Sequence, residues 1–274
     1  MTISTLYNAP AVLWVEDELT RDYLSHLWQN DPDIKFCIAG GIGNVNSAVH
    51  DARAQGYRHV FGVRDRDFKK TNRHRWENDQ SDISVFVFDS HEIENYFLLP
   101  DALADCDLNT GNRLVEQISN KLVGRAEELA AWMACRKAIS EIREFIVCEF
   151  ITHPTCEEIP DLGAAEQYIS DSPWYSSIGE KMKQIEKPNH HSDILKRVHE
   201  EYEGHLKTDA WQIHFSGKEL FHHVRDWLHI DGAGKGHQKD SDFAKSVAKW
   251  QVENSQVPQA MVDLLSAVKM RAGL

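Results

Sequence analysis

Acidic residues follow three apolar runs in the first hundred residues. Glu16 follows VLWV, Asp65 and Asp67 follow VFGVR, and Glu92 and Glu94 follow VFVFDSH. Mg²⁺ prefers hard oxygen ligands, usually one or two carboxylates together with water and substrate phosphate. In an extended segment, aspartates two positions apart point to the same side. These residue types predict a divalent metal site, and such sites support phosphoryl transfer.

Two further features suit a phosphate group. Gly40 and Gly41 follow the apolar run IKFCIA, where a glycine turn can shape a pocket. A basic run follows the third apolar run, and a patch of this kind binds phosphate backbones in a salt-dependent way. Its members are Arg64, Arg66, Lys69, Lys70, Arg73 and Arg75.

Lys218 is a weaker candidate for phosphate binding. Ser216-Gly217-Lys218 is expected to open a helix, and a helix N-terminus with a lysine can hold a phosphate. The segment lacks the GxxxxGK[ST] pattern, so a P-loop is not supported. An ordinary helix start is the alternative.

Each acidic or glycine feature also has a purely structural interpretation. Asp65 and Asp67 fit a solvated turn, and Glu16 fits the first turn of a helix, where acids favour the dipole. The glycine pair fits a tight turn, and Glu92 and Glu94 fit surface ion pairs. A shared site is favoured because all four features end successive predicted strands.

The elements that must position these residues alternate along the first hundred residues. The periodicity predicts strands at 11–15, 34–39, 59–63 and 83–88 and helices at 19–28 and 44–55, the second with Asn44 as N-cap and Gly56 as stop. This alternation predicts an α/β fold with a mainly parallel sheet flanked by helices. Ligands of open parallel sheets bind beyond the carboxyl ends of the strands, where the acidic motifs fall.

After Pro100 the pattern becomes mostly helical. Helices are expected at 112–150 with a break near Gly124, and at 162–170, 174–186, 192–206, 217–228, 241–253 and 257–270, with one short strand at 210–215. We therefore predict a catalytic α/β domain at 1–100 and a mostly helical domain at 101–274. The alternative is one continuous fold in which the helical part covers the sheet.

Composition limits the classes of function. A formal net charge of -13 over 274 residues argues against broad coating of nucleic acid, although a local basic groove is compatible with it. Neither a signal peptide nor a transmembrane segment is expected. The five scattered cysteines form no CxxC pair and fit reduced cytosolic thiols, so a cytoplasmic protein is predicted.

The pattern resembles the Toprim domain, an α/β fold shared by topoisomerases, primases and nucleases of the overcoming-lysogenization-defect type. That family carries a glutamate after its first strand, a glycine turn after its second and Asp-x-Asp after its third, which match Glu16, Gly40–Gly41 and Asp65–Asp67. The segments HEIENYF at 91–97 and GKEL at 217–220 resemble motifs of the stand-alone Toprim effectors of PARIS anti-phage defence systems. The resemblance covers residues 11–100 well and the remainder loosely.

The resemblance implies a Mg²⁺-dependent or Mn²⁺-dependent nuclease that acts on RNA such as tRNA or on DNA. Glu16 would be a general acid/base or a metal ligand, and Asp65, Asp67, Glu94 and Glu92 would hold metal. It also implies a toxin effector restrained by an ABC-type ATPase partner, and a homodimer is compatible with it. Many relatives have glycine where this chain has Asp17, which would crowd the turn or add a ligand.

Two other readings compete with the nuclease. VLWVEDE resembles the start of a response-regulator receiver, whose third strand ends in a phosphoacceptor aspartate, here Asp65. The second aspartate at 67 and the lack of a strand-Lys-Pro segment within the first 110 residues disfavour it. A Toprim-like module that binds nucleic acid or a partner without cleavage is the other alternative.

Overall fold

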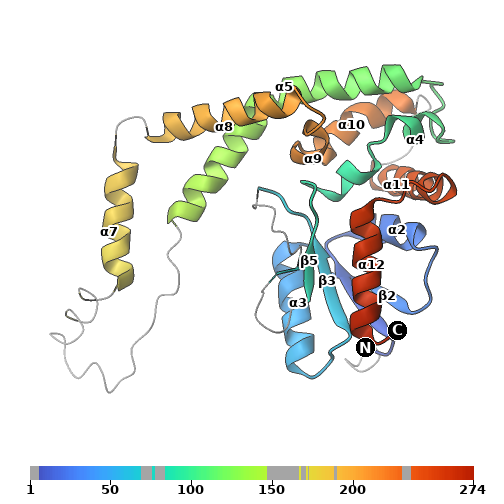
Figure 1. The fold of residues 1–274 in the computed structure, drawn as a ribbon, viewed down its shortest axis with the longest axis horizontal. Coiled ribbons are helices and arrows are strands. Elements are labelled where there is room, and N and C mark those ends of the chain that lie inside the picture. Colours follow the sequence, from blue (N-terminus) through green and yellow to red (C-terminus); the bar gives the residue numbers. More distant parts are fainter. Residues whose placement is uncertain are drawn as a thin grey trace. The chain divides into compact units, whose positions relative to one another are not determined.

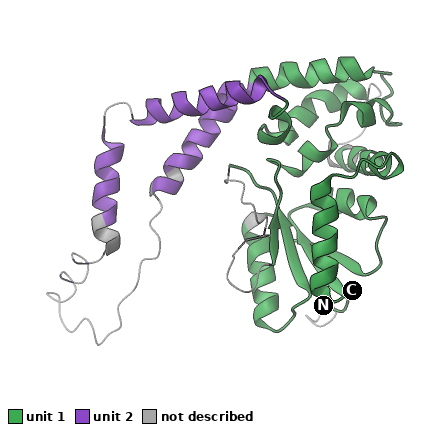
Figure 2. Ribbon diagram, viewed as in Figure 1, with its two compact units in different colours: residues 1–128, 209–274 green, residues 129–208 purple. Residues whose placement is uncertain are grey.

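The computed structural model describes residues 6–68, 76–77, 84–146, 167, 171, 173–187, 190–229 and 236–274. The chain forms two compact units (Figure 2), of which the larger joins residues 1–128 to 209–274 and the smaller comprises 129–208. The boundary expected near residue 100 lies inside the larger unit, because helices from the end of the chain pack on its α/β part.

The larger unit is built on a five-stranded sheet in the order β2-β1-β3-β5-β4 (Figure 1). Strands β1, β2, β3 and β5 are parallel, and the short edge strand β4 is antiparallel to β5. The strands are β1 (Ala11–Val15), β2 (Ile34–Ile38), β3 (Val60–Arg64), β4 (Trp76–Glu77) and β5 (Val85–Val87). In the sheet, β2 lies on one side of β1 and β3 lies on the other, so the chain reverses its direction of progress through the sheet. The gap between β1 and β3 is therefore the topological switch point.

The parallel strands form because their residues are apolar on both faces. Every residue of β3 is buried, and only Trp14 of β1 is partly exposed. A strand covered on both faces reads as a continuous apolar run, as these do in the sequence. The four predicted strands of the first hundred residues are confirmed, and so is the predicted fold class of a mainly parallel sheet with a helical C-terminal region.

Helix α2 (Glu18–Leu27) connects β1 to β2, and helix α3 (Ile42–Ala54) connects β2 to β3. Asp17 caps α2 by accepting a 2.8 Å hydrogen bond from the N–H of Thr20. Helix α3 begins after Gly41, whose φ of 146° favours glycine, so Asn44 is not its N-cap as predicted. Asn44 instead donates from its side chain to the carbonyl of Ala39 at 3.0 Å.

Glycine at position 62 lets α3 lie close to β3. A Cβ there would come within 2.7 Å of Val45 and 3.0 Å of Val49. Both valines belong to the core cluster on this side of the sheet. Figure 1 shows α3 on one side of the sheet and α2 with α12 (Gln259–Ala272) on the other.

The remaining helices of the larger unit complete its core. They are the 3₁₀ helix η1 (Ile93–Phe97), α4 (Pro100–Ala104), the first part of α5 (Val115–Ile146), α9 (Trp211–His214), α10 (Gly217–Leu228) and α11 (Gly236–Glu253). Helix α11 packs on α2, and α12 packs near β1. Helix α5 is continuous, so the break expected near Gly124 does not occur.

The strand predicted at 210–215 is wrong, because this segment contains the short helix α9. Trp211 and Phe215 are both buried and lie four residues apart, a spacing that suits one helical face as well as a strand. The apolar alternation of AWQIHF was therefore ambiguous. In the structure Ile213, between the two buried aromatic residues, is 41% exposed, which fits the helix and not a strand with one buried face.

In the described residues, the smaller unit contains the rest of α5, α7 (Pro173–Ile185) and α8 (His190–Leu206). An ion pair between Lys137 and Glu201, with Nζ 2.6 Å from Oε1, joins α5 to α8. The predicted helices at 174–186 and 192–206 are confirmed. The helix predicted at 162–170 lies outside the described residues, apart from residue 167.

Candidate metal centre

Glu16 and Asp65 lie on the two sides of the switch point, directly after β1 and β3. The backbone N–H of Asp65 donates a 2.8 Å hydrogen bond to Oε1 of Glu16. Burial, with smaller contributions from the charges of Asp67 and Asp17, raises the pKa of Glu16 to about 7 against the opposing effect of that hydrogen bond. The switch point between β1 and β3 is the position at which open α/β sheets bind their ligands.

Asp65 turns a buried carboxylate oxygen into the same region. Its Oδ1 is shielded from solvent and has no hydrogen-bond partner among the described residues. Burial, followed by the charges of Glu94, Glu16 and Glu92, raises the pKa of Asp65 well above its usual range. A carboxylate placed so close to other carboxylates without a cation is electrostatically unfavourable, so the donor set fits a divalent ion.

Glu94 belongs to η1 and is only 8% exposed. Burial and the charge of Glu92 raise the pKa of Glu94 to about 8, while Lys218 acts in the opposite direction. Glu16, Asp65 and Glu94 thus lie near enough to one another for the charges of Glu16 and Glu94 to act on Asp65. Glu16 and Asp65 directly follow β1 and β3, and Glu94 lies in the 3₁₀ helix after β5.

Asp67 reaches the cluster by a different route from the one predicted. Strand β3 ends at Arg64, and Asp67 has a left-handed backbone with φ of 51°, so the segment is not extended through both aspartates. The N–H of Asp67 donates to the carbonyl of His91 at 3.0 Å, and Nδ1 of His91 donates to the carbonyl of Asp67 at 2.8 Å. These two hydrogen bonds join the loop after β3 to the loop after β5.

Glu92 caps a helix that is distant in the sequence. Its Oε2 accepts 2.8 Å hydrogen bonds from the hydroxyl of Ser216 and from the N–H of Lys218, at the start of α10. A carboxylate at a helix N-terminus satisfies free N–H groups and complements the dipole. One oxygen of this predicted metal ligand therefore has a structural role.

The segment Ile93–Phe97 is held against α9 and α10 by Asn95 and Gly217. The amide of Asn95 donates to the carbonyls of Gln212 at 2.8 Å and Phe215 at 3.0 Å. A Cβ at Gly217 would lie 2.6 Å from the backbone nitrogen of Asn95, so only glycine fits. The 91–97 and 217–220 motifs thus form one packing unit that positions Glu94.

A second buried contact holds η1 from the side of α11. Gln251 is fully buried and donates from Nε2 to the carbonyl of Tyr96 at 2.8 Å. Its Oε1 accepts from the hydroxyl of Tyr23 on α2, also at 2.8 Å. Helices α2, η1 and α11 are therefore joined by one hydrogen-bonded chain.

The residues predicted to bind phosphate lie in different environments in the structure. Gly40, with φ of 80°, donates from its N–H to the carbonyl of Glu16 at 2.9 Å, and with Gly41 it forms the turn beside that glutamate. Arg66 is buried and donates to the carbonyl of Ile213 at 3.1 Å, so it holds the loop and does not present its charge to solvent. Lys69, Lys70, Arg73 and Arg75 lie outside the described residues.

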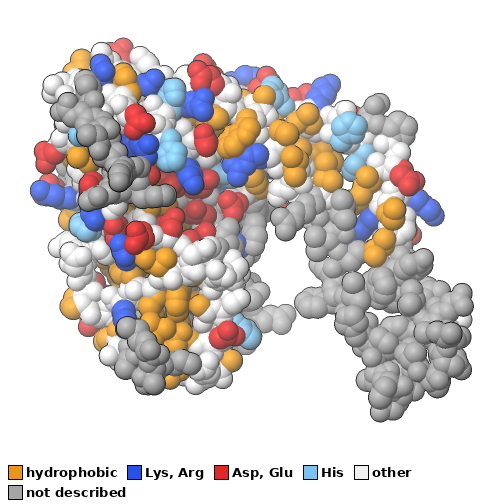
Figure 3. Space-filling view, turned by 180° about the vertical axis from the view of Figure 1, so that it is seen from behind, with side chains coloured by type: hydrophobic (Ala, Val, Ile, Leu, Met, Phe, Trp, Pro, Cys, Tyr) orange, Lys and Arg blue, Asp and Glu red, His pale blue; other side chains and the backbone are white. Residues whose placement is uncertain are grey.

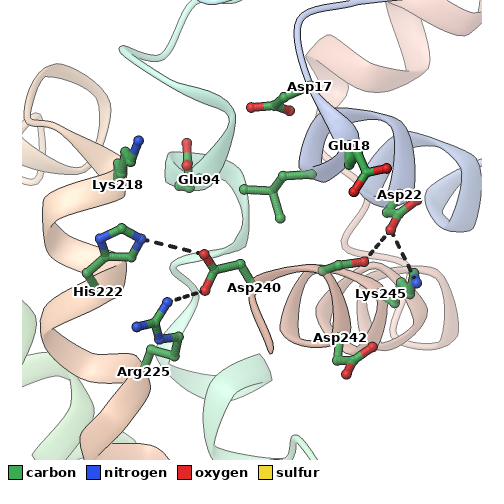
Figure 4. Close-up of a pocket in the computed structure, with 12 residues that line it drawn as sticks. Asp17, Glu18, Asp22, Glu94, Lys218, His222, Arg225, Asp240, Asp242 and Lys245 are labelled. Carbon is green, nitrogen blue, oxygen red and sulfur yellow. Dashed lines mark hydrogen bonds and ion pairs between the residues drawn. The ribbon is translucent and has the colours of Figure 1, made fainter. Parts of the chain in front are cut away.

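A pocket of about 860 Å³ adjoins the acidic cluster, between α2, η1, α10 and α11 (Figure 4). In it, Arg225 pairs with Asp240 at 2.5 Å and Lys245 with Asp22 at 3.2 Å. Lys218 is exposed and forms no ion pair with any residue in the described part of the chain. Figure 3 shows acidic side chains gathered at a hollow of the larger unit, with Lys and Arg side chains near them.

His91 is the residue of this region that the sequence analysis did not select. It is 1% exposed and lies next to Glu92. Ligand atoms of Asp67, His91 and Glu92 all lie within 4.8 Å of one another. The sequence signal for His91 as a metal ligand was its position directly before Glu92, an acidic residue that follows a predicted strand.

Comparison with known proteins does not assign the chain to a family. No protein-family model matches the chain, and no curated protein matches its sequence. Among the described residues, no helix is both long and apolar enough to cross a membrane.

Proposed function

We propose that this chain is a metal-dependent nuclease whose active site is the edge of the sheet at the switch point. The observation that carries the proposal is the convergence of Glu16, Asp65 and Glu94 there, with an oxygen of Asp65 buried and unbonded. Raised pKa values in all three groups indicate carboxylates that a cation would stabilise.

Asp65, Asp67 and Glu94, with the second oxygen of Glu92, would hold Mg²⁺ or Mn²⁺. When bound, the ion would neutralise charge on the phosphoryl oxygens and favour deprotonation of an attacking water. Glu16, oriented by the N–H of Asp65, is the group best suited to hold or release a proton near neutral pH. Lys218, exposed at the start of α10 and lining the same pocket as Glu94, would bind a substrate phosphate through its ammonium group.

The substrate class follows from the chemistry and from the sequence resemblance together. Carboxylate-bound divalent ions suit in-line displacement at a phosphodiester. The rest of the basic run, Lys69, Lys70, Arg73 and Arg75, suits a nucleic-acid backbone. The resemblance to stand-alone Toprim effectors supports RNA such as tRNA, or DNA, as substrate. It also supports a role as a toxin of anti-phage defence under the control of an ABC-type ATPase partner.

The receiver alternative receives no support from the topology. Its phosphoacceptor chemistry needs a lysine at the end of a fifth parallel strand. In the described residues the sheet has four parallel strands, and its fifth strand, β4, is an antiparallel pair of residues at the edge.

The proposal is tested by incubating the purified chain with end-labelled RNA and DNA in Mg²⁺, Mn²⁺ or EDTA. A nuclease cleaves at least one substrate with metal and neither with EDTA. Binding of the substrate that is equal in all three conditions, with no cleavage, would favour the non-catalytic module. Phosphorylation of Asp65 by a small phosphodonor would favour the receiver.

A further inference from the structure

His91 is held through both its backbone and its ring. Its backbone N–H donates to the carbonyl of Ile213 at 2.8 Å, and its carbonyl accepts from the N–H of Asp67 at 3.0 Å. Its ring donates from Nδ1 to the carbonyl of Asp67 at 2.8 Å. The imidazole is therefore buried in one orientation.

The hydrogen bond at Nδ1 also determines the tautomer of a neutral ring. A carbonyl only accepts, so Nδ1 carries the hydrogen and the lone pair of the ring lies on Nε2. Nε2 is 4.0 Å from Oε1 of Glu92, too far for a hydrogen bond. Histidines that bind metals typically donate their other ring N–H to a carbonyl or a carboxylate in this way.

Glu92 divides its two oxygens between two roles. Oε2 accepts from Ser216 and Lys218 at the start of α10, and this fixes the carboxylate. Oε1 faces Nε2 of His91. With a carboxylate oxygen of Asp67, these atoms form a group of three ligands within 4.8 Å.

An independent observation indicates that a cation belongs beside this group. Oδ1 of Asp65 is shielded from solvent and has no hydrogen-bond partner among the described residues. The charges of Glu94, Glu16 and Glu92 all act on Asp65, and Glu92 is itself a member of the group. These neighbours are acids, so a bound cation would satisfy an oxygen that the described residues leave unsatisfied.

We propose that His91, Asp67 and Glu92 form a mixed nitrogen and oxygen site that binds a divalent transition metal ion in preference to Mg²⁺. The inference deepens the proposed function, because it names ligands and a metal class for the same edge of the sheet. It does not depend on cleavage, since it concerns binding of the ion alone.

The preference for a transition metal follows from the imidazole. Mg²⁺ is bound through oxygen and keeps several waters, whereas imidazole nitrogen suits first-row transition metals. Affinity for such a site rises from Mn²⁺ towards Cu²⁺, with Zn²⁺ also above Mn²⁺. Mn²⁺ is thus the weakest binder of this class and a stringent probe, and its electron spin reports directly on nitrogen ligands.

The experiment is electron spin-echo spectroscopy of Mn²⁺ added to the full chain, together with Mn²⁺ titration in the presence of Mg²⁺. His91→Asn is the informative variant, because the asparagine amide can replace the donor at Nδ1 and has no group at the position of Nε2. His229→Asn is the matched control. His229 also bonds through Nδ1 to a backbone carbonyl, that of Leu108 at 3.2 Å, and it lies outside the cluster.

The proposal expects echo modulation from one coordinated imidazole nitrogen in wild type and in His229→Asn, and its loss in His91→Asn. Mn²⁺ affinity should fall about 10-fold or more in His91→Asn, with the melting temperature in EDTA unchanged. Mn²⁺ bound without nitrogen modulation would overturn the histidine site and leave a carboxylate-based nuclease intact. Absence of any Mn²⁺ binding would overturn the histidine site but not a Mg²⁺-dependent nuclease, whereas nitrogen modulation without cleavage in either Mg²⁺ or Mn²⁺ would overturn only the nuclease.

Discussion

The N–H of Asp65 donates to Oε1 of Glu16 across the gap between β1 and β3, at 2.8 Å. The bond joins the two strand ends at which the order of the sheet reverses. The bond orients Glu16 and also holds Asp65 close to other carboxylates. Repulsion among these carboxylates, and the contacts that hold them in place, lead to the predictions that follow.

Asp65→Asn should stabilise the metal-free protein and weaken metal binding. The amide keeps the size of the side chain and removes the repulsion from Glu94 and Glu16. We expect the melting temperature in EDTA at pH 8 to rise by about 2–4 °C for each kcal/mol of relieved repulsion, and the stabilisation by added Mg²⁺ to disappear. Scanning calorimetry with and without Mg²⁺ measures both. A variant that is less stable in EDTA and still stabilised by Mg²⁺ would contradict the assignment.

Glu94 should make the metal-free protein less stable as pH rises. Its pKa is raised in the folded state to about 8, above the ordinary value of 4.5. Ionisation therefore disfavours the folded state, and the loss begins above the unfolded pKa and is complete above the folded one. The difference in unfolding free energy between wild type and Glu94→Gln should fall steadily from about pH 4.5 to about pH 8 in EDTA.

Urea titrations of both proteins across this range provide the measurement. The titrating groups that Glu94 does not influence are shared by the two proteins, so their contribution cancels in the difference. The repulsion between Glu94 and Asp65 remains in the difference and acts in the same direction. Parallel curves with no change in the difference would mean that Glu94 is not held in a buried, acidic environment.

Gly217→Ala should displace the 3₁₀ helix η1, which carries Glu94, because Gly217 packs against Asn95. Its Cβ would meet the backbone of Asn95 at 2.6 Å, which forces η1 and Glu94 to shift. We expect a loss of about 1–3 kcal/mol of stability and weaker Mn²⁺ binding. Gly124→Ala is the control, since no atom lies within 4 Å of its Cβ and alanine favours the helix. Equal stability of the two variants would rule out the tight contact.

The basic run gives a prediction that rests on sequence alone. Arg73→Glu combined with Arg75→Glu should weaken nucleic-acid binding and flatten its dependence on salt, since fewer phosphate contacts release fewer counterions. Binding isotherms at several salt concentrations test this. Affinity that equals wild type at every concentration would identify the run as a solvated loop.

The sequence was sufficient for the sheet because its signals are local. Each parallel strand is a short apolar run followed by a polar turn, and position relative to a strand end places Glu16 and Asp65 at the same edge. The same local signals failed at 210–215, where the aromatic spacing fits two structures. They also failed for the boundary near residue 100, because the packing of α11 on α2 involves residues far apart in the chain.

The parts of the site that were missed depend on long-range packing. Glu92 bonds to Ser216, and Asn95 packs on Gly217, across more than a hundred residues. Asp67 joins the cluster through its pairing with His91 and a left-handed turn, not through strand periodicity. No spacing rule within one segment predicts such contacts.

The central claim is tested most directly by cleavage of labelled RNA and DNA by Glu16→Ala and Asp67→Ala, measured beside wild type in a Mg²⁺ series. Glu18→Ala is the control, since this exposed neighbour lies at the first turn of α2. We predict that both site variants lose cleavage about 100-fold or more, and that Glu18→Ala keeps it. Full metal-dependent activity in Glu16→Ala and Asp67→Ala would show that the active site lies elsewhere.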